Sequence, residues 1–552
     1  MFQKASIRSY LNQAYLLGLL MVAVGLTLSP FLMGMSQFWL IAVWLVDGFL
    51  GNRNENVIPT EAGAQEGICF HSDFKHKFLR FWSNKAAVLL VAFYLMHVIG
   101  LLWTTDFQYA LKDLRVKLPI LVMPFVLSSI EPLDRKRFDF VMLVYVMSVF
   151  VATLFSFTAY MRHDYEDIRE ISRFISHIRF CLQMVFCIAI ILWYVATTKY
   201  EFNIKYQFKQ FLQFYLVFWF AYQIYIFEAL SGYVTLVAII VISIIYAFMQ
   251  LKMSRGWRIG IGIHVVALLV VGVVILVHYV KPLVQVEKVD FATLEQQTAQ
   301  GNPYWHDTIY NPVEDGKYVG LYYCQKEMQE AWAQRSDRAF DGTTESGENL
   351  EATLARYLTS KDLRKDAQGV MALTDEDIHN VEQGVANYNN WRHPGLRARL
   401  SATLFEYNLY RRYDNPNGGS LAQRIEYTRA SFHLIGQHPW LGVGTGDVPQ
   451  AFAQAYDEIH SPLKEEYRFR AHNQYLAIAV AFGLVGLAFF LFVLLYPWCS
   501  SRKHHTYLYM AFLTIMLLSM FPEDTLETQA GATLFAFFEA LLLFARPALR
   551  PE

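Results

Sequence analysis

The sequence predicts an all-α, polytopic membrane protein of about twelve transmembrane helices, since a spanning helix needs roughly 20 mostly apolar residues. Of 552 residues, 55% are hydrophobic and only 17% are charged, and the apolar residues gather in long segments. The 16% of aromatic residues suit two membrane–water interfaces. The expected helix cores are 14–33, 36–50, 86–104, 117–130, 138–160, 177–197, 210–227, 229–250, 258–279, 472–497, 506–521 and 529–546.

The distribution of Lys and Arg predicts the orientation of these helices. The first apolar segment is expected to be a transmembrane helix and not a cleaved signal, because further apolar segments follow it directly. Short loops that would share a side with the N-terminus are far richer in Lys and Arg than those on the other side. The positive-inside rule therefore places both termini in the cytoplasm and the long loop in the periplasm, in a bacterial inner membrane.

Three regions follow from this topology. Residues 1–279 hold helices one to nine, residues 280–471 form a large periplasmic loop, and residues 472–552 hold helices ten to twelve. The loop is predicted to be mainly helical, because 321–340, 348–360 and 375–388 place apolar residues near helical spacing. Cys324 is its lone cysteine, so the loop must fold by packing. An apparent insertion at 340–392 is either a solvated decoration or a part that shapes the acceptor site or docks a partner.

Two clusters of cations on the periplasmic side depart from the charge rule. They lie at 111–117 and between Arg162 and Arg179. Interfacial snorkelling of the long side chains explains them in one interpretation. In the other, they hold an anionic substrate, and Arg179 is the best candidate because it lies just inside an apolar helix.

The stretch GVGTG at 442–446 superficially resembles a nucleotide-binding loop. No βαβ pattern surrounds it and no Lys-Ser/Thr follows, which excludes the dinucleotide and P-loop motifs. Gly442, Gly444 and Gly446 are expected to form a tight turn with close backbone approach. A nest of backbone N–H groups that holds an anion is the alternative.

Two longer stretches resemble a known family. RIEYTRASFHLIGQHPWLGVGTGD at 424–447, followed by AHNQYLAIAVAFGLVGL at 471–487, resembles the signature of the O-antigen ligase and polymerase superfamily. The order of helices and the large loop between the ninth and tenth fit the same family. The resemblance implies an integral-membrane glycosyltransferase of the GT-C type that uses glycans linked to undecaprenyl diphosphate.

The resemblance also implies roles for individual residues. His472 matches the essential histidine of the family and Arg424 its loop arginine, while Arg179, in SHIRF at 176–180, is a weaker match. Histidine can take a proton from an acceptor hydroxyl near neutral pH, and arginine matches phosphate oxygens. One departure is that the outer turn at 227–234, around Ser231, lacks the arginine that many members carry. Either another cation, such as Arg179 or Arg429, replaces it, or the diphosphate is held differently.

Each candidate has a structural alternative. His472 could cap its helix, Arg424 could pair with Glu426 or Glu406, and Arg179 could be a structural cation. The supporting candidates are Asn473, His177, Glu228 and Arg429. Asn473 is expected to cap or orient the helix start, and a histidine in the position of His177 is more often simply interfacial. Glu228 is either a partner for an arginine or a site residue.

The predicted function is metal-independent, cofactor-free transfer of a glycan from undecaprenyl diphosphate to a lipid A–core sugar, as in an O-antigen ligase. An O-antigen polymerase and a protein O-oligosaccharyltransferase are the alternatives with the same donor. A transporter or flippase is disfavoured, because the spans lack paired inward charges and inverted repeats. The expected partners are the lipid-linked donor, the acceptor and membrane lipids, with no nucleic acid.

Overall fold

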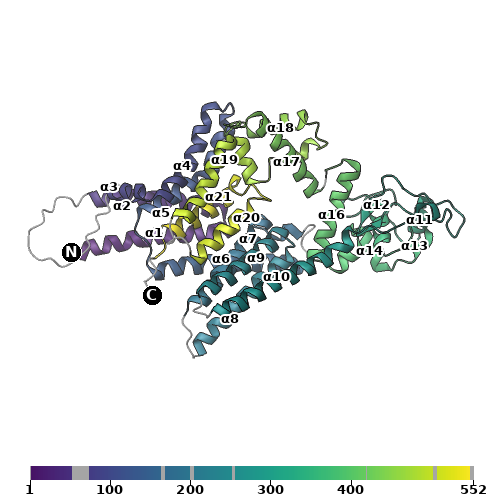
Figure 1. Cartoon of the computed structure of the whole chain (residues 1–552), viewed down its shortest axis with the longest axis horizontal. Coiled ribbons are helices and arrows are strands. Elements are labelled where there is room, and N and C mark those ends of the chain that lie inside the picture. Colours follow the sequence, from purple (N-terminus) through teal and green to yellow (C-terminus); the bar gives the residue numbers. More distant parts are fainter. Residues whose placement is uncertain are drawn as a thin grey trace, which may run out of the picture. The chain divides into compact units, whose positions relative to one another are not determined.

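A computed structural model describes residues 2–52, 74–162, 168–198, 204–250, 255–417, 419–500 and 506–547. These residues are mostly helical, and β1 (Val313–Glu314) and β2 (Lys317–Tyr318) form the two-stranded antiparallel sheet found among them. The predicted all-α class is confirmed. The chain divides into two compact units (Figure 1). The first comprises Met1–Gln250, Tyr427–Ile459 and Phe469–Glu552, and the second Leu251–Glu426 and His460–Arg468.

The first unit contains most of the apolar helices, together with two more polar ones. They are α1 (Phe2–Leu28), α2 (Pro30–Asn52), α3 (Phe74–Ser83), α4 (Lys85–Ile99), α5 (Phe107–Ser129), α6 (Arg135–Arg162), α7 (His177–Thr197), α8 (Ile204–Ile226), α9 (Leu230–Gln250), α18 (Val448–Glu458), α19 (Gln474–Ser500), α20 (Tyr507–Ser519) and α21 (Gln529–Leu543). The boundary between the units falls within α17 (Ser420–Gln437).

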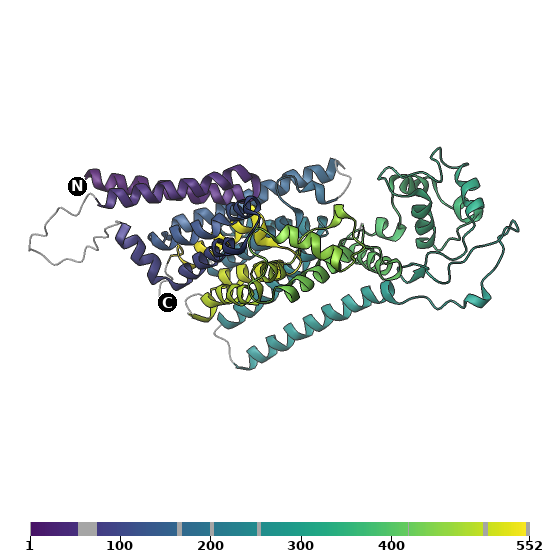
Figure 2. The same cartoon turned by 90° about the horizontal axis from the view of Figure 1, so that it is seen from above.

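The turn between α1 and α2 is sharp. Pro30 is the first residue of α2, a position whose N–H has no helical partner, so proline costs no hydrogen bond there. A side chain at Gly25 would lie 2.6 Å from the Met33 nitrogen, so glycine permits the close approach. As a result α1 and α2 lie side by side, as the purple pair in Figures 1 and 2. The predicted helix core 14–33 is wrong at its end, because the chain turns after Leu28.

Seven helical segments among the described residues are long and apolar enough to cross a membrane. They are Ile7–Leu28, Pro30–Leu50, Lys85–Trp103, Arg135–Arg162, His177–Thr197, Leu230–Phe248 and Gln474–Ser500. The other five predicted spans also coincide with helices, but α20 and α21 have only 13 and 15 residues, short of the roughly 20 that a span needs. The chain is thus a multi-pass membrane protein, and the number of twelve spans stays a prediction.

Helix α19 is broken near its middle. Gly483 has a φ of +67° and non-helical backbone angles, which frees backbone groups that a continuous helix would pair. The turn that contains Gly442, Gly444 and Gly446, here called the glycine turn, satisfies them. The N–H groups of Val443 and Gly444 donate to the carbonyls of Val480 and Ala481, each at 2.9 Å. The N–H of Leu484 in turn donates to the Pro439 carbonyl at 2.8 Å.

The second unit contains one long apolar helix and a small domain. Its helices are α10 (Arg255–Val284), α11 (Gln325–Trp332), α12 (Leu350–Ser360), α13 (Ala367–Met371), α14 (Asp375–Gln383), α15 (Tyr388–Arg392) and α16 (Leu396–Tyr413). The segments predicted to be helical contain α11, α12 and α14. Thr374 forms a capping box with Asp377 at the start of α14, and Gly384, with φ +101°, ends it.

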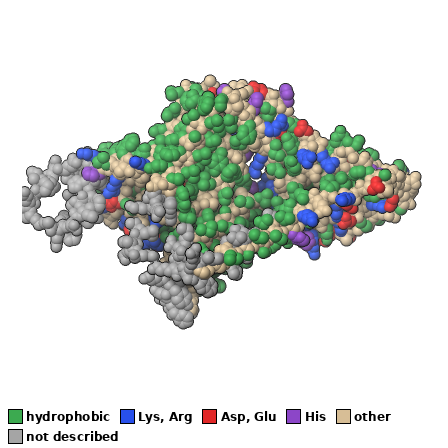
Figure 3. Space-filling model, viewed as in Figure 1, with side chains coloured by type: hydrophobic (Ala, Val, Ile, Leu, Met, Phe, Trp, Pro, Cys, Tyr) green, Lys and Arg blue, Asp and Glu red, His purple; other side chains and the backbone are tan. Residues whose placement is uncertain are grey.

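The apparent insertion at 340–392 is part of the core of this domain. The fully buried Trp332 of α11 packs with Leu354 and Tyr357 of α12 and with Val381 of α14. The interpretation of this segment as a solvated decoration is therefore wrong. Figure 3 shows hydrophobic side chains over the apolar helices, while many of the charged side chains lie over the small domain.

The membrane division at 279/280 and 471/472 stays a prediction, since the compact units are defined by packing. Helix α10 packs on α16 and so belongs to the second unit, although its sequence is that of a spanning helix.

Candidate active site

His472 lies directly before α19 in a strained backbone conformation. Its φ is +45°, a left-handed value that residues with a side chain rarely adopt outside functional or turn positions. The next residue, Asn473, fixes the start of the helix: its Oδ1 accepts the Leu476 N–H at 3.0 Å, and its Nδ2 donates to the Phe521 carbonyl at 2.9 Å. The imidazole ring stacks on Tyr427, with ring centres 5.3 Å apart.

An acidic turn lies opposite this histidine. The segment FPEDTLE at 521–527 joins α20 to α21 and carries Glu523, Asp524 and Glu527, all largely buried. His472 Nδ1 lies 4.0 Å from Asp524 Oδ1. An imidazole that takes up a proton here would gain a nearby negative charge, which favours its charged form.

Arg470 and Lys117 balance the acidic turn. The Arg470 guanidinium lies 3.3 Å from Asp524 and 3.4 Å from Glu527, and it donates to the Tyr109 hydroxyl at 3.0 Å. Lys117, from α5, contacts Glu527 and Asp113 at 2.6 Å each. Burial raises the pKa of the Glu527 carboxyl, but the charges of Lys117 and Arg470 outweigh burial and lower this pKa to about 2.

The inner part of this cluster has almost no free space. A cavity of about 20 Å³ lies among His97, Asp113, Lys117 and Glu527, with room for about one water molecule. A sugar or a phosphate cannot enter it. Lys117, Asp113 and Glu527 therefore support the site, whereas His472, with a third of its side chain exposed, can meet a substrate.

Arg179, near the start of α7, contacts the acidic turn at Glu523. Its Nη2 is 3.8 Å from Glu523 Oε2, which is beyond hydrogen-bond distance. Its buried Nε has no hydrogen-bond partner among the described residues. Cys181, two residues further along α7, packs against Gly232 of α9, where an added side chain would lie 3.1 Å from its Cβ. The start of α7, which carries Arg179, therefore packs beside α9, whose preceding turn at Ser231 lacks the expected arginine.

The remaining candidates are only partly brought together. Arg424 belongs to the second unit and His472 to the first, so their pairing stays a prediction. Glu426 accepts hydrogen bonds from the hydroxyls of Tyr410 and Ser461, both at 2.6 Å. Arg429 is an exposed residue of α17, and His177 is the half-buried first residue of α7. Glu228 lies in the turn between α8 and α9 with a φ of +50°.

The glycine turn has the close backbone contacts predicted for it. Side chains at Gly442, Gly444 and Gly446 would lie 2.4, 2.8 and 2.1 Å from Ala481, Thr104 and Asp106 respectively. Asp447 accepts from the backbone N–H groups of Thr105 and Asp106. The N–H groups of Val443 and Gly444 already donate to α19. The glycine turn therefore joins the segment before α18 to α19, and few of its N–H groups remain to bind an anion.

His472, Glu523 and Asp524 are also the residues that could hold a metal ion. One ligand-type atom from each lies within 4.8 Å of the others. However, Arg179 and Arg470 lie against the two carboxylates, and their positive charges oppose a divalent cation at that place. Metal-independent transfer stays a prediction.

The fold and this site define a multi-pass membrane protein with an ionic cluster around a half-buried histidine at the start of an apolar helix. Residues 375–491 match the family model for O-antigen ligase. The match contains both stretches that carry the resemblance, with Arg424 and His472, and confirms it. It implies a membrane glycosyltransferase-like enzyme with lipid-linked glycan substrates in a bacterial membrane. No curated protein matches the chain.

The acidic turn was not predicted from the sequence. The sequence does contain a signal for this turn, which is three carboxylates within seven residues between two short apolar segments. Such carboxylates are costly near a membrane unless cations pair with them. Lys117 was predicted to be either a snorkelling cation or a substrate contact. The structure shows neither, since its ammonium is buried between Asp113 and Glu527.

Proposed function

We propose that the chain is an O-antigen ligase-like glycosyltransferase of the bacterial inner membrane. It moves a glycan from undecaprenyl diphosphate to a lipid A–core sugar on the periplasmic face, with both termini in the cytoplasm and residues 280–471 in the periplasm. The observation that carries the proposal is His472, which faces Asp524 at 4.0 Å with Arg470 and Arg179 against the same acidic turn. The family match over residues 375–491 supports the reaction class.

The reaction exchanges one bond of the anomeric carbon for another and moves one proton. The acceptor hydroxyl oxygen attacks the anomeric carbon of the donor sugar, and the bond from that carbon to the diphosphate oxygen breaks, with inversion at that carbon. The hydroxyl proton passes to the imidazole of His472, and the bonding electrons leave with undecaprenyl diphosphate. General-base assistance of this kind typically contributes about 10²–10⁴-fold in rate.

Asp524 acts as a positioning residue in this scheme. Its carboxylate stabilises the imidazolium that forms when His472 takes the proton, while Arg470 holds the carboxylate in place at 3.3 Å. The scheme assigns no step to a metal ion.

Arg179 and Arg424 are the proposed diphosphate ligands. A guanidinium stays charged and presents planar donors that fit phosphate oxygens. The contact between Arg179 Nη2 and Glu523 is too long for a hydrogen bond, so this carboxylate does not commit the Nη2 donors. This supports Arg179 as the replacement for the arginine missing near Ser231.

Deletion of the gene, followed by lipopolysaccharide electrophoresis, tests the proposal. We expect lipid A–core without long glycan, together with long glycan that accumulates on undecaprenyl diphosphate, and restoration by the wild-type gene. A single repeat on lipid A–core would instead indicate a polymerase. Normal lipopolysaccharide with unglycosylated secreted proteins would indicate a protein O-oligosaccharyltransferase, and either result contradicts the ligase assignment.

A further inference from the structure

The small domain of the second unit contains a pocket that none of the residues assigned above lines. Its volume is about 820 Å³, within the range of roughly 300–1,000 Å³ that small-molecule sites occupy. The segment 302–326 and the helices α12 and α16 line it, with Trp305, Tyr323, Phe405 and Tyr413 as its aromatic side chains. Most of the lining precedes residue 375, where the family match begins.

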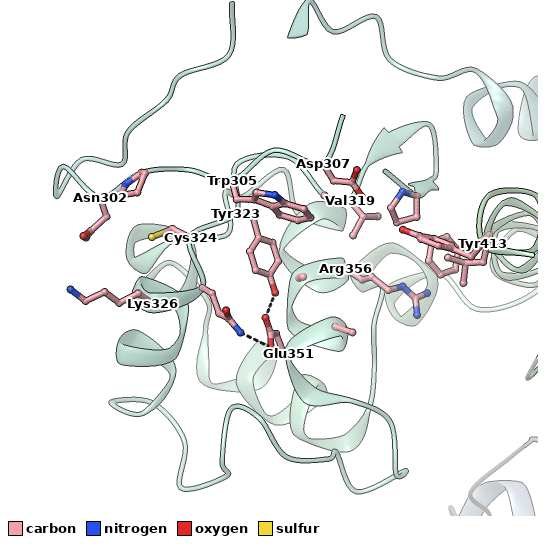
Figure 4. A pocket seen from close by; sticks show the side chains of 18 residues that line it. Asn302, Trp305, Asp307, Val319, Tyr323, Cys324, Lys326, Glu351, Arg356 and Tyr413 are labelled. Carbon is pink, nitrogen blue, oxygen red and sulfur yellow. Dashed lines mark hydrogen bonds between the residues drawn. The ribbon is translucent and has the colours of Figure 1, made fainter. Parts of the chain in front are cut away.

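Trp305 presents a rigid aromatic surface to this pocket. The residue is 59% exposed, so its ring is open to a ligand. The backbone of Trp305 exchanges two hydrogen bonds with Tyr323, at 2.8 and 3.0 Å. The two rings meet edge to face with centres 6.0 Å apart, so Tyr323 holds Trp305 in place (Figure 4).

Two carboxylates that line the pocket are held in fixed positions, Asp307 next to Trp305 and Glu351 at the far end of Tyr323 (Figure 4). Glu351 accepts the Tyr323 hydroxyl at 2.5 Å and the Gln325 amide at 3.1 Å, one on each carboxylate oxygen (Figure 4). Each oxygen keeps a further lone pair for a ligand hydroxyl. Asp307, next to Trp305, is held by the N–H groups of Ile309 and Tyr310 at 3.1 and 2.8 Å, both on Oδ1.

The charges of the pocket disfavour an anionic ligand. The Arg356 guanidinium is occupied by both oxygens of Glu314, at 2.8 Å each, and lies over the Phe405 ring. Lys326 points away from Trp305 and Glu351 (Figure 4). The acceptors that remain are carboxylates, which repel phosphate and are costly to bury against an acyl chain.

A neutral sugar matches these features. A pyranose has polarised C–H groups on its faces, which the negative face of an aromatic ring attracts, and hydroxyl groups around its edge that donate to carboxylates. We propose that this pocket binds a neutral segment of an oligosaccharide, with one sugar ring on Trp305 beside Asp307 and the hydroxyls of a neighbouring sugar on Glu351. That this oligosaccharide belongs to the transferred glycan rests on the proposed function.

Fluorine NMR of the full-length protein in detergent, with 5-fluorotryptophan at its 12 tryptophans, tests the pocket directly. The Trp305→Phe variant identifies the Trp305 resonance, and Trp82→Phe identifies that of Trp82, which is similarly exposed at 64% but lies on α3. The probe is the oligosaccharide released by mild acid from the lipid-linked glycan of the host cells. We expect a saturable shift of the Trp305 resonance and none for Trp82.

Variants then separate the pocket from the rest of the chain. Glu351→Gln should raise the apparent Kd, read from the Trp305 resonance, several-fold. Ile309→Ala should not change it, because Ile309 is 75% exposed in the same segment but does not line the pocket. An unchanged Trp305 resonance at saturating oligosaccharide would overturn the proposal, and so would a shift produced by inorganic pyrophosphate instead.

The His472→Ala variant distinguishes the two proposals. If the pocket binds the glycan, this variant should show the same Trp305 shift as the wild type even though transfer is lost. Retained transfer in His472→Ala with a normal Trp305 shift would contradict the proposed mechanism and leave the saccharide site standing. Lost transfer in His472→Ala with no Trp305 shift would contradict the saccharide site and leave the proposed mechanism standing.

Discussion

Buried charges play different parts in the two units. In the first unit, Lys117, Arg470 and Glu527 come from segments far apart in the chain and meet among apolar helices. In the second unit, the core around Trp332 is apolar, and ion pairs such as Lys361–Asp377 lie at its margin. Buried charges need partners to offset the loss of water. One buried ionic cluster of the first unit therefore surrounds the candidate site, whereas the ion pairs of the second unit fix helices around a core.

Removal of Glu527 should lower the stability of the first unit more than any other substitution considered. Glu527→Leu leaves Lys117 and Arg470 without their shared counter-charge, which typically costs about 3–5 kcal/mol in a buried cluster. Glu295→Gln, in an exposed pair with Arg364, is the matched control and should change stability little. Thermal unfolding in detergent measures both, and equal melting temperatures for the two variants would contradict a supporting role for the cluster.

A basic shift of pH should affect the second unit through Lys365. Burial, reinforced by Lys317, lowers the pKa of the Lys365 ammonium to about 8. Between about pH 8 and 10.5 the unfolded chain keeps a proton that the folded domain has lost, so folding becomes more favourable as pH rises through this window, by up to about 3 kcal/mol.

The Lys365→Met variant isolates this effect. Its carbon chain can occupy the same buried space, but the variant has no ammonium to titrate, so its melting temperature should lack the rise between pH 8 and 10.5. Comparison of the two pH profiles removes the titration of other lysines and tyrosines. Parallel profiles would show that Lys365 keeps its proton in the folded domain.

Substitution in the glycine turn should cost less, about 1–3 kcal/mol, the range for strained backbone positions. Gly442→Ala places a methyl group 2.4 Å from the Ala481 backbone at a φ of +67°. Gly436→Ala is the control, since no atom lies within 4 Å of its added methyl group, and alanine is preferred to glycine in a helix. Unfolding experiments should show a loss for the first variant and none for the second.

The smallest expected effect is that of Asp524→Asn on catalysis. The amide keeps the shape but removes the charge that stabilises a protonated His472, so kcat should fall roughly tenfold, or about 1.4 kcal/mol, while KM for the donor stays near the wild-type value. Glu458→Gln, beside the surface residue His433, is the control. A rise in KM with unchanged kcat would assign Asp524 to substrate binding instead of positioning.

Local patterns account for what could be predicted. The apolar segments predicted most helices, because their length and composition leave few alternatives in a membrane. The motif around His472 pointed to the histidine, since its pattern occupies neighbouring residues. Cys324, without a second cysteine in the loop, correctly indicated a domain folded by packing around an apolar core.

The missing part of the prediction lies in contacts between distant segments. Lys117 and Glu527 are 410 positions apart, and no local pattern relates them. The break at Gly483 depends on the glycine turn that fills it, so a continuous helix was the natural expectation. The core at 340–392 was missed because its polar composition concealed the few apolar residues that face inward.

The most direct test of the site is glycan transfer by purified protein in proteoliposomes that contain lipid-linked donor and lipid A–core acceptor. His472→Ala should lower kcat by at least about 100-fold, as expected for a lost general base, while the melting temperature stays near that of the wild type. His433→Ala, which removes a histidine from a surface pair with Glu458, should transfer at the wild-type rate. Transfer by His472→Ala at a rate close to that of His433→Ala would contradict the assignment of His472 as the base.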